Sequence, residues 1–296
     1  MKALQGTGVA IVTPFNEHLN IDNEALRRVV EHCIEGGVDY LVVLGTTGES
    51  VTLDRAEKKA VTKLVAEANM GRVPLVLGIG GNNTSRVTEE LRSTDLEPFA
   101  AILSVSPYYN KPTQEGIYMH FKQLAGASSK PLILYNVPGR TASNILPETV
   151  LRLAEDCPNI VGIKEASGDM NQVKEIIRLT PAEFMVISGD DITALPTVLA
   201  GGHGVISVLA QGIPSAFSSM IALGRQGQSD RAFSLHHKMK TAMELIFEEG
   251  NPAGIKAMLE YQKICSAKVR LPLVEASPTL KKKIAEFVDQ GLKMPA

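Results

Sequence analysis

The stretch PLILYNVPGRTASNILPETVLRLAEDCPNIVGIK, residues 131–164, contains the unit that recurs along this chain. It opens and closes with short runs rich in Ile, Leu and Val, at 131–136 and 160–164, each bounded by Pro, Gly or Asn. Such runs are typical of strands that are buried on both faces of a parallel sheet. The residues between them have the apolar spacing of an amphipathic helix. We therefore interpret this stretch as one strand–helix–strand unit.

The same alternation continues along most of the 296 residues. Leu26, Val29, Val30 and Cys33 form one apolar helix stripe between two such runs. Eight units predict an α/β fold, a closed (β/α)8 TIM barrel, and the alternative is an open doubly wound sheet with a second domain. The eight predicted strands are 9–13, 40–44, 74–78, 100–105, 131–136, 160–164, 184–188 and 203–207.

No strand pattern follows residue 225 or so. Leu235, Met239, Met243 and Ile246 are spaced as one helix face, and breaks at 250–252 and 270–272 separate two further helical stretches. We predict a catalytic barrel over residues 1–225 and a C-terminal helical region, appended to it, over residues 226–296.

Composition excludes several classes of protein. Thirty Lys and Arg against 32 Asp and Glu give a net charge of −2, which does not suit a nucleic-acid binder. The three cysteines have no C-x-x-C spacing, and no histidine motif suggests a catalytic metal. No apolar run reaches the ~18–20 residues of a membrane span, and the N-terminal residues do not resemble a signal peptide. We expect a cytoplasmic protein without a membrane, metal or nucleic-acid partner.

In a parallel barrel the chemistry belongs to the carboxyl ends of the strands. Lys164 ends a predicted strand that is buried on both faces. Burial disfavours a charged ammonium group, and a neutral amine can attack a carbonyl to form a Schiff base. The alternative is that Lys164 reaches solvent or pairs with Glu165. Tyr135 ends the preceding strand and is either a proton-transfer group beside Lys164 or an aromatic residue at the rim of the core.

Two further strand ends carry groups that suit a carboxylate. Thr46 and Thr47 lie in a glycine-flanked turn, where their hydroxyls either bind a ligand carboxylate or cap the turn. Arg140 follows a Pro-Gly turn and either clamps a carboxylate with two hydrogen bonds or is solvated.

Taken in order, GTTGES (45–50), YYNKP (108–112), NVPGRT (136–141) and GIKE (162–165) resemble the dihydrodipicolinate synthase family of pyruvate-dependent class I aldolases. The resemblance covers essentially the whole chain. It implies an eight-stranded barrel with a C-terminal helical region, and a Schiff base between pyruvate and Lys164 with no other cofactor. The implied reaction joins pyruvate to L-aspartate 4-semialdehyde and gives 4-hydroxy-tetrahydrodipicolinate, in lysine biosynthesis through diaminopimelate.

The resemblance also implies roles for the other site residues. The family's proton relay falls on Tyr135, Thr46 and Tyr109, and Arg140 would hold the semialdehyde. Thr47 would join Thr46 in binding the carboxylate of pyruvate, and Gly189 and Ile206 would line the pocket. In the family the tyrosine that matches Tyr109 reaches the site of a neighbouring subunit. We therefore expect a homo-oligomer, a homotetramer built as a dimer of dimers.

Three other functions stay open. N-acetylneuraminate lyases resemble this chain at Lys164 and Tyr135, but they usually have Ser-Thr in place of Thr46-Thr47 and lack a match to Arg140. An aldolase for another 2-oxo acid is the second alternative. The third is a barrel that senses a metabolite without catalysis, which would be expected to lose Lys164, Tyr135 or Arg140.

At the positions that match a regulatory lysine-binding site, the chain differs in part from the lysine-sensitive members of the family. Positions that match the lysine-binding site of sensitive members are retained at Ser50, Leu53, Asn82 and Tyr108. Sensitive relatives tend to have histidines and a glutamate where this chain has Arg55, Lys58 and Arg86. Three added cations oppose a ligand that carries an ammonium group. We therefore predict weak or absent inhibition by lysine.

Overall fold

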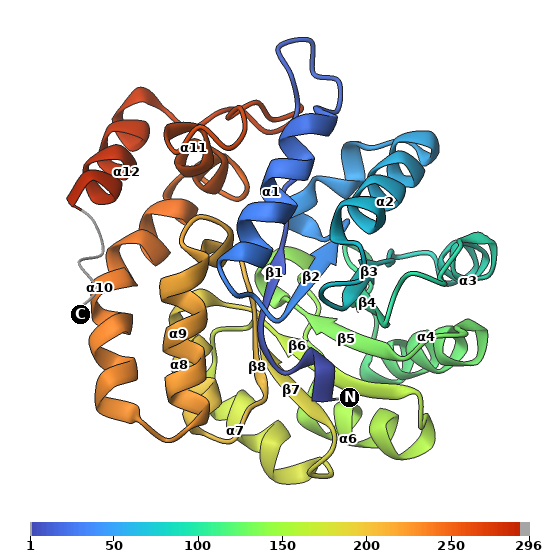
Figure 1. The fold of residues 1–296 in the computed structure, drawn as a ribbon. Coiled ribbons are helices and arrows are strands. Elements are labelled where there is room, and N and C mark those ends of the chain that lie inside the picture. Colours follow the sequence, from blue (N-terminus) through green and yellow to red (C-terminus); the bar gives the residue numbers. More distant parts are fainter. Residues whose placement is uncertain (1, 291–296) are drawn as a thin grey trace.

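A closed barrel of eight parallel strands forms the centre of the molecule (Figure 1). The computed structural model describes residues 2–290, so residues 291–296 of the predicted C-terminal region lie outside the described residues. β1 pairs with β2 on one side and with β8 on the other, which closes the sheet. The predicted TIM barrel is confirmed and the open sheet is wrong. The strands are β1 (Gly6–Ala10), β2 (Tyr40–Val43), β3 (Leu75–Gly78), β4 (Ala101–Val105), β5 (Leu132–Asn136), β6 (Ile160–Glu165), β7 (Met185–Ser188) and β8 (Gly204–Ser207).

Helices connect the strands and surround them. α1 buries the predicted stripe that includes Leu26 and Val29. α2 begins with a capping box, in which the Glu57 backbone N–H donates to the Asp54 carboxylate at 2.8 Å and the Asp54 N–H donates to Glu57 at 3.0 Å. The helices of this layer are α1 (Asn23–Glu35), α2 (Arg55–Asn69), α3 (Thr84–Ser93), α4 (Gln114–Ala127), the short α5 (Pro138–Thr141), α6 (Pro147–Asp156), α7 (Met170–Leu179), α8 (Asp191–Leu199) and α9 (Pro214–Arg225).

The first strand differs from its predicted position. It spans Gly6–Ala10 and not 9–13, because the apolar run marked only its second half. At Gly8 an added Cβ would lie 2.2 Å from the Tyr40 ring, which fills the barrel interior beside it. Glycine, a poor strand former, is therefore required in this strand by close packing, which a propensity pattern does not record.

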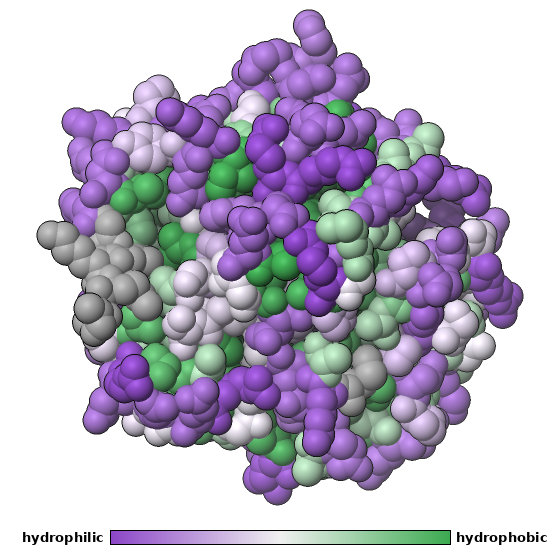
Figure 2. Space-filling view, in the orientation of Figure 1, coloured by the Kyte–Doolittle hydropathy of each residue, from purple (hydrophilic) through white to green (hydrophobic). Residues whose placement is uncertain are grey.

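Apolar side chains form two separate clusters, one inside the barrel and one between the strands and the helices. The inner cluster fills the barrel with side chains that include Val42, Val76, Ile133 and Ile187, so the barrel is a packed core and not a pore. On the face in Figure 2, polar side chains cover most of the surface, and apolar ones show mainly in the gaps between helices. No helix within residues 2–290 is long and apolar enough to cross a membrane.

The C-terminal region contains α10 (Ser229–Glu248), α11 (Ala253–Tyr261) and α12 (Pro278–Gln290). Its breaks lie where the sequence predicts them, and the predicted face of α10, including Leu235 and Met239, is buried. The three helices lie along one side of the barrel, next to α9 and α1 (Figure 1). Apart from glycine, their buried apolar residues belong to the same cluster as those of the barrel helices.

The burial of His120 in the helical layer makes the stability of the fold depend on pH. It is buried on α4, its Nδ1 lies 2.9 Å from Thr84 Oγ1, and its Nε2 has no partner within the described residues. Burial lowers the pKa of His120 from 6.5 to about 4. The unfolded chain therefore binds this proton more readily than the folded chain, and stability falls as the pH drops from about 6.5 towards about 4.

We expect His120 to account for a loss of about 2 kcal/mol in the free energy of unfolding between about pH 7 and about pH 5. Urea denaturation of the wild type and His120→Gln at the two pH values measures it. The variant is expected to lose about 2 kcal/mol less than the wild type over this range. Equal losses of unfolding free energy in the wild type and the variant would contradict the attribution of this pH dependence to His120.

Candidate active site

Lys164 and Tyr135 lie side by side at the carboxyl ends of β6 and β5. The two residues are register partners across the strand pair. Both are buried, with 5% and 8% of their surface exposed. Lys164 Nζ lies 4.4 Å from the centroid of the Tyr135 ring. The prediction that these side chains are neighbours is confirmed.

Lys164 does not pair with Glu165. Successive side chains of a strand point to opposite faces, so Glu165 points away from Lys164. The Glu165 carboxylate accepts hydrogen bonds from Asn136 Nδ2 at 2.8 Å, Gln172 Nε2 at 2.9 Å and the Ser167 N–H at 2.7 Å. Within residues 2–290 Lys164 Nζ has neither an ion pair nor a hydrogen bond. Its amine is therefore committed to no other polar group and is available to a carbonyl compound.

Two more predicted residues surround this pair. Gly189 follows β7 directly, and an added Cβ there would lie 2.9 Å from Lys164 Cε, so only glycine leaves the lysine stem in its place. Ile206 on β8 is fully buried in the same inner cluster as Tyr135. β5 to β8 thus contribute four of the predicted site residues to one end of the barrel.

The predicted turn after β2 is a 3-10 turn, Thr46–Gly48. The Thr46 side chain is exposed, whereas Thr47 is buried and its Oγ1 accepts a hydrogen bond from Asn251 Nδ2 at 3.0 Å. Two residues beyond Thr47, the buried Glu49 carboxylate pairs with Lys256 Nζ at 2.5 Å.

Asn251 and Lys256 belong to the C-terminal region, and neither was predicted from the sequence as part of the site. One signal was present in the sequence. Lys256 is a single charge within residues 253–259, a segment that is otherwise apolar or glycine and is wholly buried. A lysine in such a run needs a buried partner. The identity of that partner, about 200 residues earlier in the chain, is not visible in a local pattern.

Tyr109 and Arg140 lie on the surface. Tyr109 follows β4 with 87% of its surface exposed and a left-handed φ of 76°. Its backbone N–H donates to Thr141 O at 3.3 Å, which joins its loop to α5, where Arg140 is exposed. In the part of the chain that the structure describes, neither side chain makes a hydrogen bond or ion pair. The backbone bond from Tyr109 to Thr141 therefore joins the two loops, and both side chains are open to a further partner.

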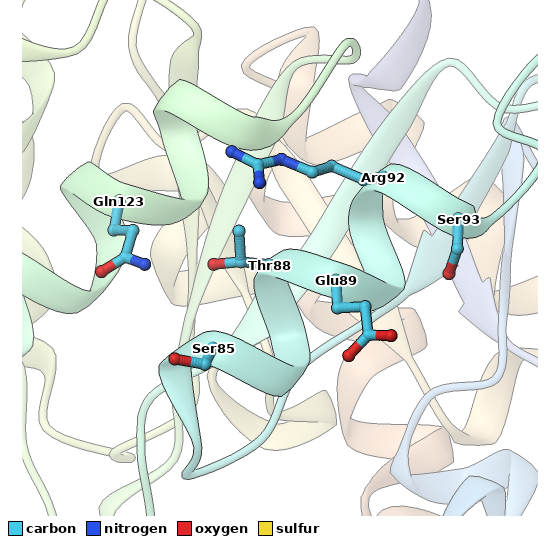
Figure 3. Close-up of a pocket in the computed structure, with 6 residues that line it drawn as sticks. All are labelled: Ser85, Thr88, Glu89, Arg92, Ser93 and Gln123. Atoms are coloured by element: carbon cyan, nitrogen blue, oxygen red, sulfur yellow. The ribbon is translucent and has the colours of Figure 1, made fainter.

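A surface depression lies elsewhere, between α3 and α4 (Figure 3). It belongs to the outer helical layer and includes none of the predicted site residues. Within residues 2–290 no group of three or more His, Cys, Asp or Glu side chains is arranged to hold a metal ion. The depression is lined by Ser85, Thr88, Glu89, Arg92, Ser93 and Gln123.

A closed (β/α)8 barrel with a buried lysine beside a tyrosine, at the carboxyl ends of adjacent strands, is the arrangement of a class I aldolase. A model of the dihydrodipicolinate synthetase family matches residues 3–291, and the chain belongs to this family.

Relatives and solved structures agree with this assignment. The chain is 56% identical to the 4-hydroxy-tetrahydrodipicolinate synthase of Flavobacterium psychrophilum, over 98% of this chain and 99% of that protein. It is 47% identical to the synthase of Parabacteroides distasonis, over 97% of each chain. The crystal structure of dihydrodipicolinate synthase from Thermotoga maritima has a TM-score of 0.94 at 37% identity, over 97% of this chain and 98% of that chain.

Proposed function

We propose that this chain condenses pyruvate with L-aspartate 4-semialdehyde through a Schiff base on Lys164 and forms 4-hydroxy-tetrahydrodipicolinate. The observation that carries the proposal is the buried amine of Lys164, without a polar partner in the described residues and 4.4 Å from the Tyr135 ring centroid. The names of its relatives support the identity of the product.

The first step joins Lys164 to pyruvate. The amine attacks the ketone carbon, a carbinolamine forms, and loss of water leaves a protonated imine. Tyr135 gives a proton to the departing hydroxyl and passes protons onward through Thr46 and through Tyr109 of a neighbouring subunit. Loss of a methyl proton converts the imine to an enamine, which is the nucleophile of the second step.

The turn after β2 holds the pyruvate carboxylate. Thr46 and Thr47 supply hydroxyl and backbone N–H donors to an anion that accepts hydrogen bonds only. Gly189 leaves room for the lysine stem, and Ile206 forms an apolar wall of the pocket. These residues fix the bound pyruvate with its ketone carbon towards Lys164.

The second step forms the carbon–carbon bond. The enamine attacks the aldehyde carbon of the semialdehyde, whose carboxylate Arg140 binds with its planar guanidinium group. The amino group of that substrate then displaces Lys164 from the imine carbon, which closes the ring and frees the enzyme. The reaction uses the covalent link to Lys164 and needs no separate cofactor.

We infer that Tyr109 completes the site of a second copy of the chain in a homotetramer, a dimer of dimers. Its exposed phenol and the bond from its backbone to Thr141, next to Arg140, support this inference. One solved relative, with a TM-score of 0.95 and 37% identity, is described as a monomeric dihydrodipicolinate synthase variant. We also propose that residues 1–225 are the catalytic barrel and that residues 226–296 are a C-terminal helical region. The enzyme would act in the cytoplasm, in lysine biosynthesis.

Arg140→Ala tests the second substrate. Loss of a hydrogen-bonded charge costs about 1.5–3 kcal/mol, so KM for the semialdehyde is expected to rise about tenfold to hundredfold. Trapping of pyruvate on Lys164 is expected to stay nearly unchanged. Arg92→Ala, which removes an exposed arginine from α3 (Figure 3), is the matched control. Equal steady-state kinetics in both variants would count against the role of Arg140.

Lysine is expected to inhibit weakly or not at all. Arg55 and Arg86 are exposed, and Lys58 lies 3.9 Å from Glu90. Arg55 and Lys58 are on α2 and Arg86 is on α3, and these positive charges disfavour an ammonium-bearing ligand. Asn82, at another position that matches the lysine site, donates from Nδ2 to Tyr108 O at 3.1 Å. An inhibition curve measures the effect, and half-maximal inhibition below about 1 mM, a binding free energy near 4 kcal/mol, would contradict the prediction.

An assay with both substrates tests the function itself. The purified chain is expected to consume pyruvate only when L-aspartate 4-semialdehyde is present, and to leave N-acetylneuraminate uncleaved. Pyruvate consumption with other aldehydes but not with the semialdehyde would favour an aldolase for another 2-oxo acid. No reaction in any of these assays would favour a metabolite-sensing barrel.

A further inference from the structure

A hydrogen bond joins Asn251, in the C-terminal region, to Thr47 in the turn after β2. Asn251 Nδ2 donates and Thr47 Oγ1 accepts, at 3.0 Å, and both side chains are buried. A hydroxyl group that accepts from an amide retains its own hydrogen for another acceptor. Within residues 2–290 no acceptor receives the hydrogen of Thr47. Asn251 Oδ1 also has no partner there, so it does not draw that hydrogen to itself.

A buried ion pair fixes the segment that carries this bond. Lys256 Nζ pairs with Glu49 at 2.5 Å and donates to Lys268 O at 2.7 Å. The other oxygen of Glu49 accepts from the Arg270 backbone N–H at 2.9 Å. Glu49 is two residues from Thr47, and Lys256 is on the helix that begins just after Asn251. The C-terminal region therefore holds the turn after β2 at two points.

We propose that Asn251 is a positioning residue that orients the Thr47 hydroxyl so that it donates its hydrogen to the carboxylate of pyruvate. The inference rests on the function proposed above and extends it to the C-terminal region. Asn251 does not touch the substrate. It acts through Thr47, because a donor on one side of the hydroxyl leaves the hydrogen to point to the other side, where a carboxylate only accepts.

Asn251→Asp tests the polarity with little change of shape. A carboxylate in place of the amide accepts the hydrogen of Thr47 and brings a negative charge close to the substrate carboxylate. We expect the pyruvate concentration for half-maximal borohydride trapping on Lys164 to rise about tenfold or more, with an unchanged maximal yield of adduct. The increase is expected to shrink at lower pH, because a protonated aspartate donates again. A purely structural role would not give this pH dependence.

Gln262→Glu is the matched control. It makes the same amide-to-acid change in the C-terminal region, where Gln262 Nε2 donates to Gly212 O at 2.9 Å and not to the turn after β2. We expect no change in half-saturation by pyruvate. If the wild type forms no adduct, the proposed function fails. If the wild type forms the adduct and Asn251→Asp has the same half-saturation, the role of Asn251 fails while the function stands.

A second measurement avoids the added charge, in case Asn251→Asp folds poorly. Thr47→Val, Asn251→Ala and the double variant form a double-mutant cycle in the same trapping experiment. We expect Asn251→Ala to raise the half-saturation only when the Thr47 hydroxyl is present. Equal effects of Asn251→Ala with and without that hydroxyl would overturn the proposal.

Discussion

Lys164→Ala is expected to abolish the condensation of pyruvate with the semialdehyde, lowering kcat by at least about 10⁴-fold. The variant lacks the amine that forms the covalent intermediate, and within residues 2–290 no other lysine lies over the Tyr135 ring. Lys256 is the other buried lysine among the described residues, and its amine is held by Glu49 at 2.5 Å. The measurement is the rate of the two-substrate assay at saturating substrates, with the melting temperature as a check of folding.

Lys174→Ala provides the control, since it removes an exposed lysine from α7, on the helix that follows the strand of Lys164. It is expected to keep the wild-type rate. A folded Lys164→Ala variant with a rate within about tenfold of the wild type would contradict covalent catalysis at this position.

Tyr135→Phe is expected to lower kcat by about 10²–10⁴-fold, the usual contribution of a positioned acid–base group. The substitution removes only the hydroxyl and keeps the ring that packs against Lys164. In the described part of the chain this hydroxyl has no hydrogen-bond partner, so the free energy of unfolding is expected to stay the same. Rapid-quench borohydride trapping is expected to show slow formation of the adduct rather than its loss.

Tyr40→Phe is the matched control, with the opposite pattern. Tyr40 is fully buried at the start of β2, and its hydroxyl donates to Val205 O at 3.2 Å. Loss of this bond is expected to lower the free energy of unfolding by about 1 kcal/mol and to leave the rate of condensation unchanged. If the two variants had the same rate, Tyr135 would have no role in proton transfer.

Local patterns were sufficient to predict the barrel and the proximity of Lys164 to Tyr135. Apolar runs of five or six residues predicted seven of the eight strands nearly in place, because buried parallel strands carry few polar residues. The neighbourhood of Lys164 and Tyr135 followed from strand order, since adjacent strands of a barrel bring their carboxyl ends together. The position of β1 did not follow, because Gly8 is set by the bulk of Tyr40.

The contacts that support the turn after β2 could not be predicted from local patterns. Asn251 bonds to Thr47 and Lys256 to Glu49 across about 200 residues of sequence, and each pair is one buried contact without periodicity. Such pairs depend on how the C-terminal helices dock on the barrel, which no window of sequence contains. The roles of Tyr109 and Arg140 likewise depend on a substrate or a second chain, and they remain predictions.

Borohydride reduction in the presence of pyruvate, followed by peptide mass analysis, tests the covalent mechanism most directly. We predict one reduced pyruvate adduct, on the peptide that contains Lys164, and no adduct in Lys164→Ala. An adduct on a different lysine, or a folded and active enzyme that forms no adduct at all, would contradict it.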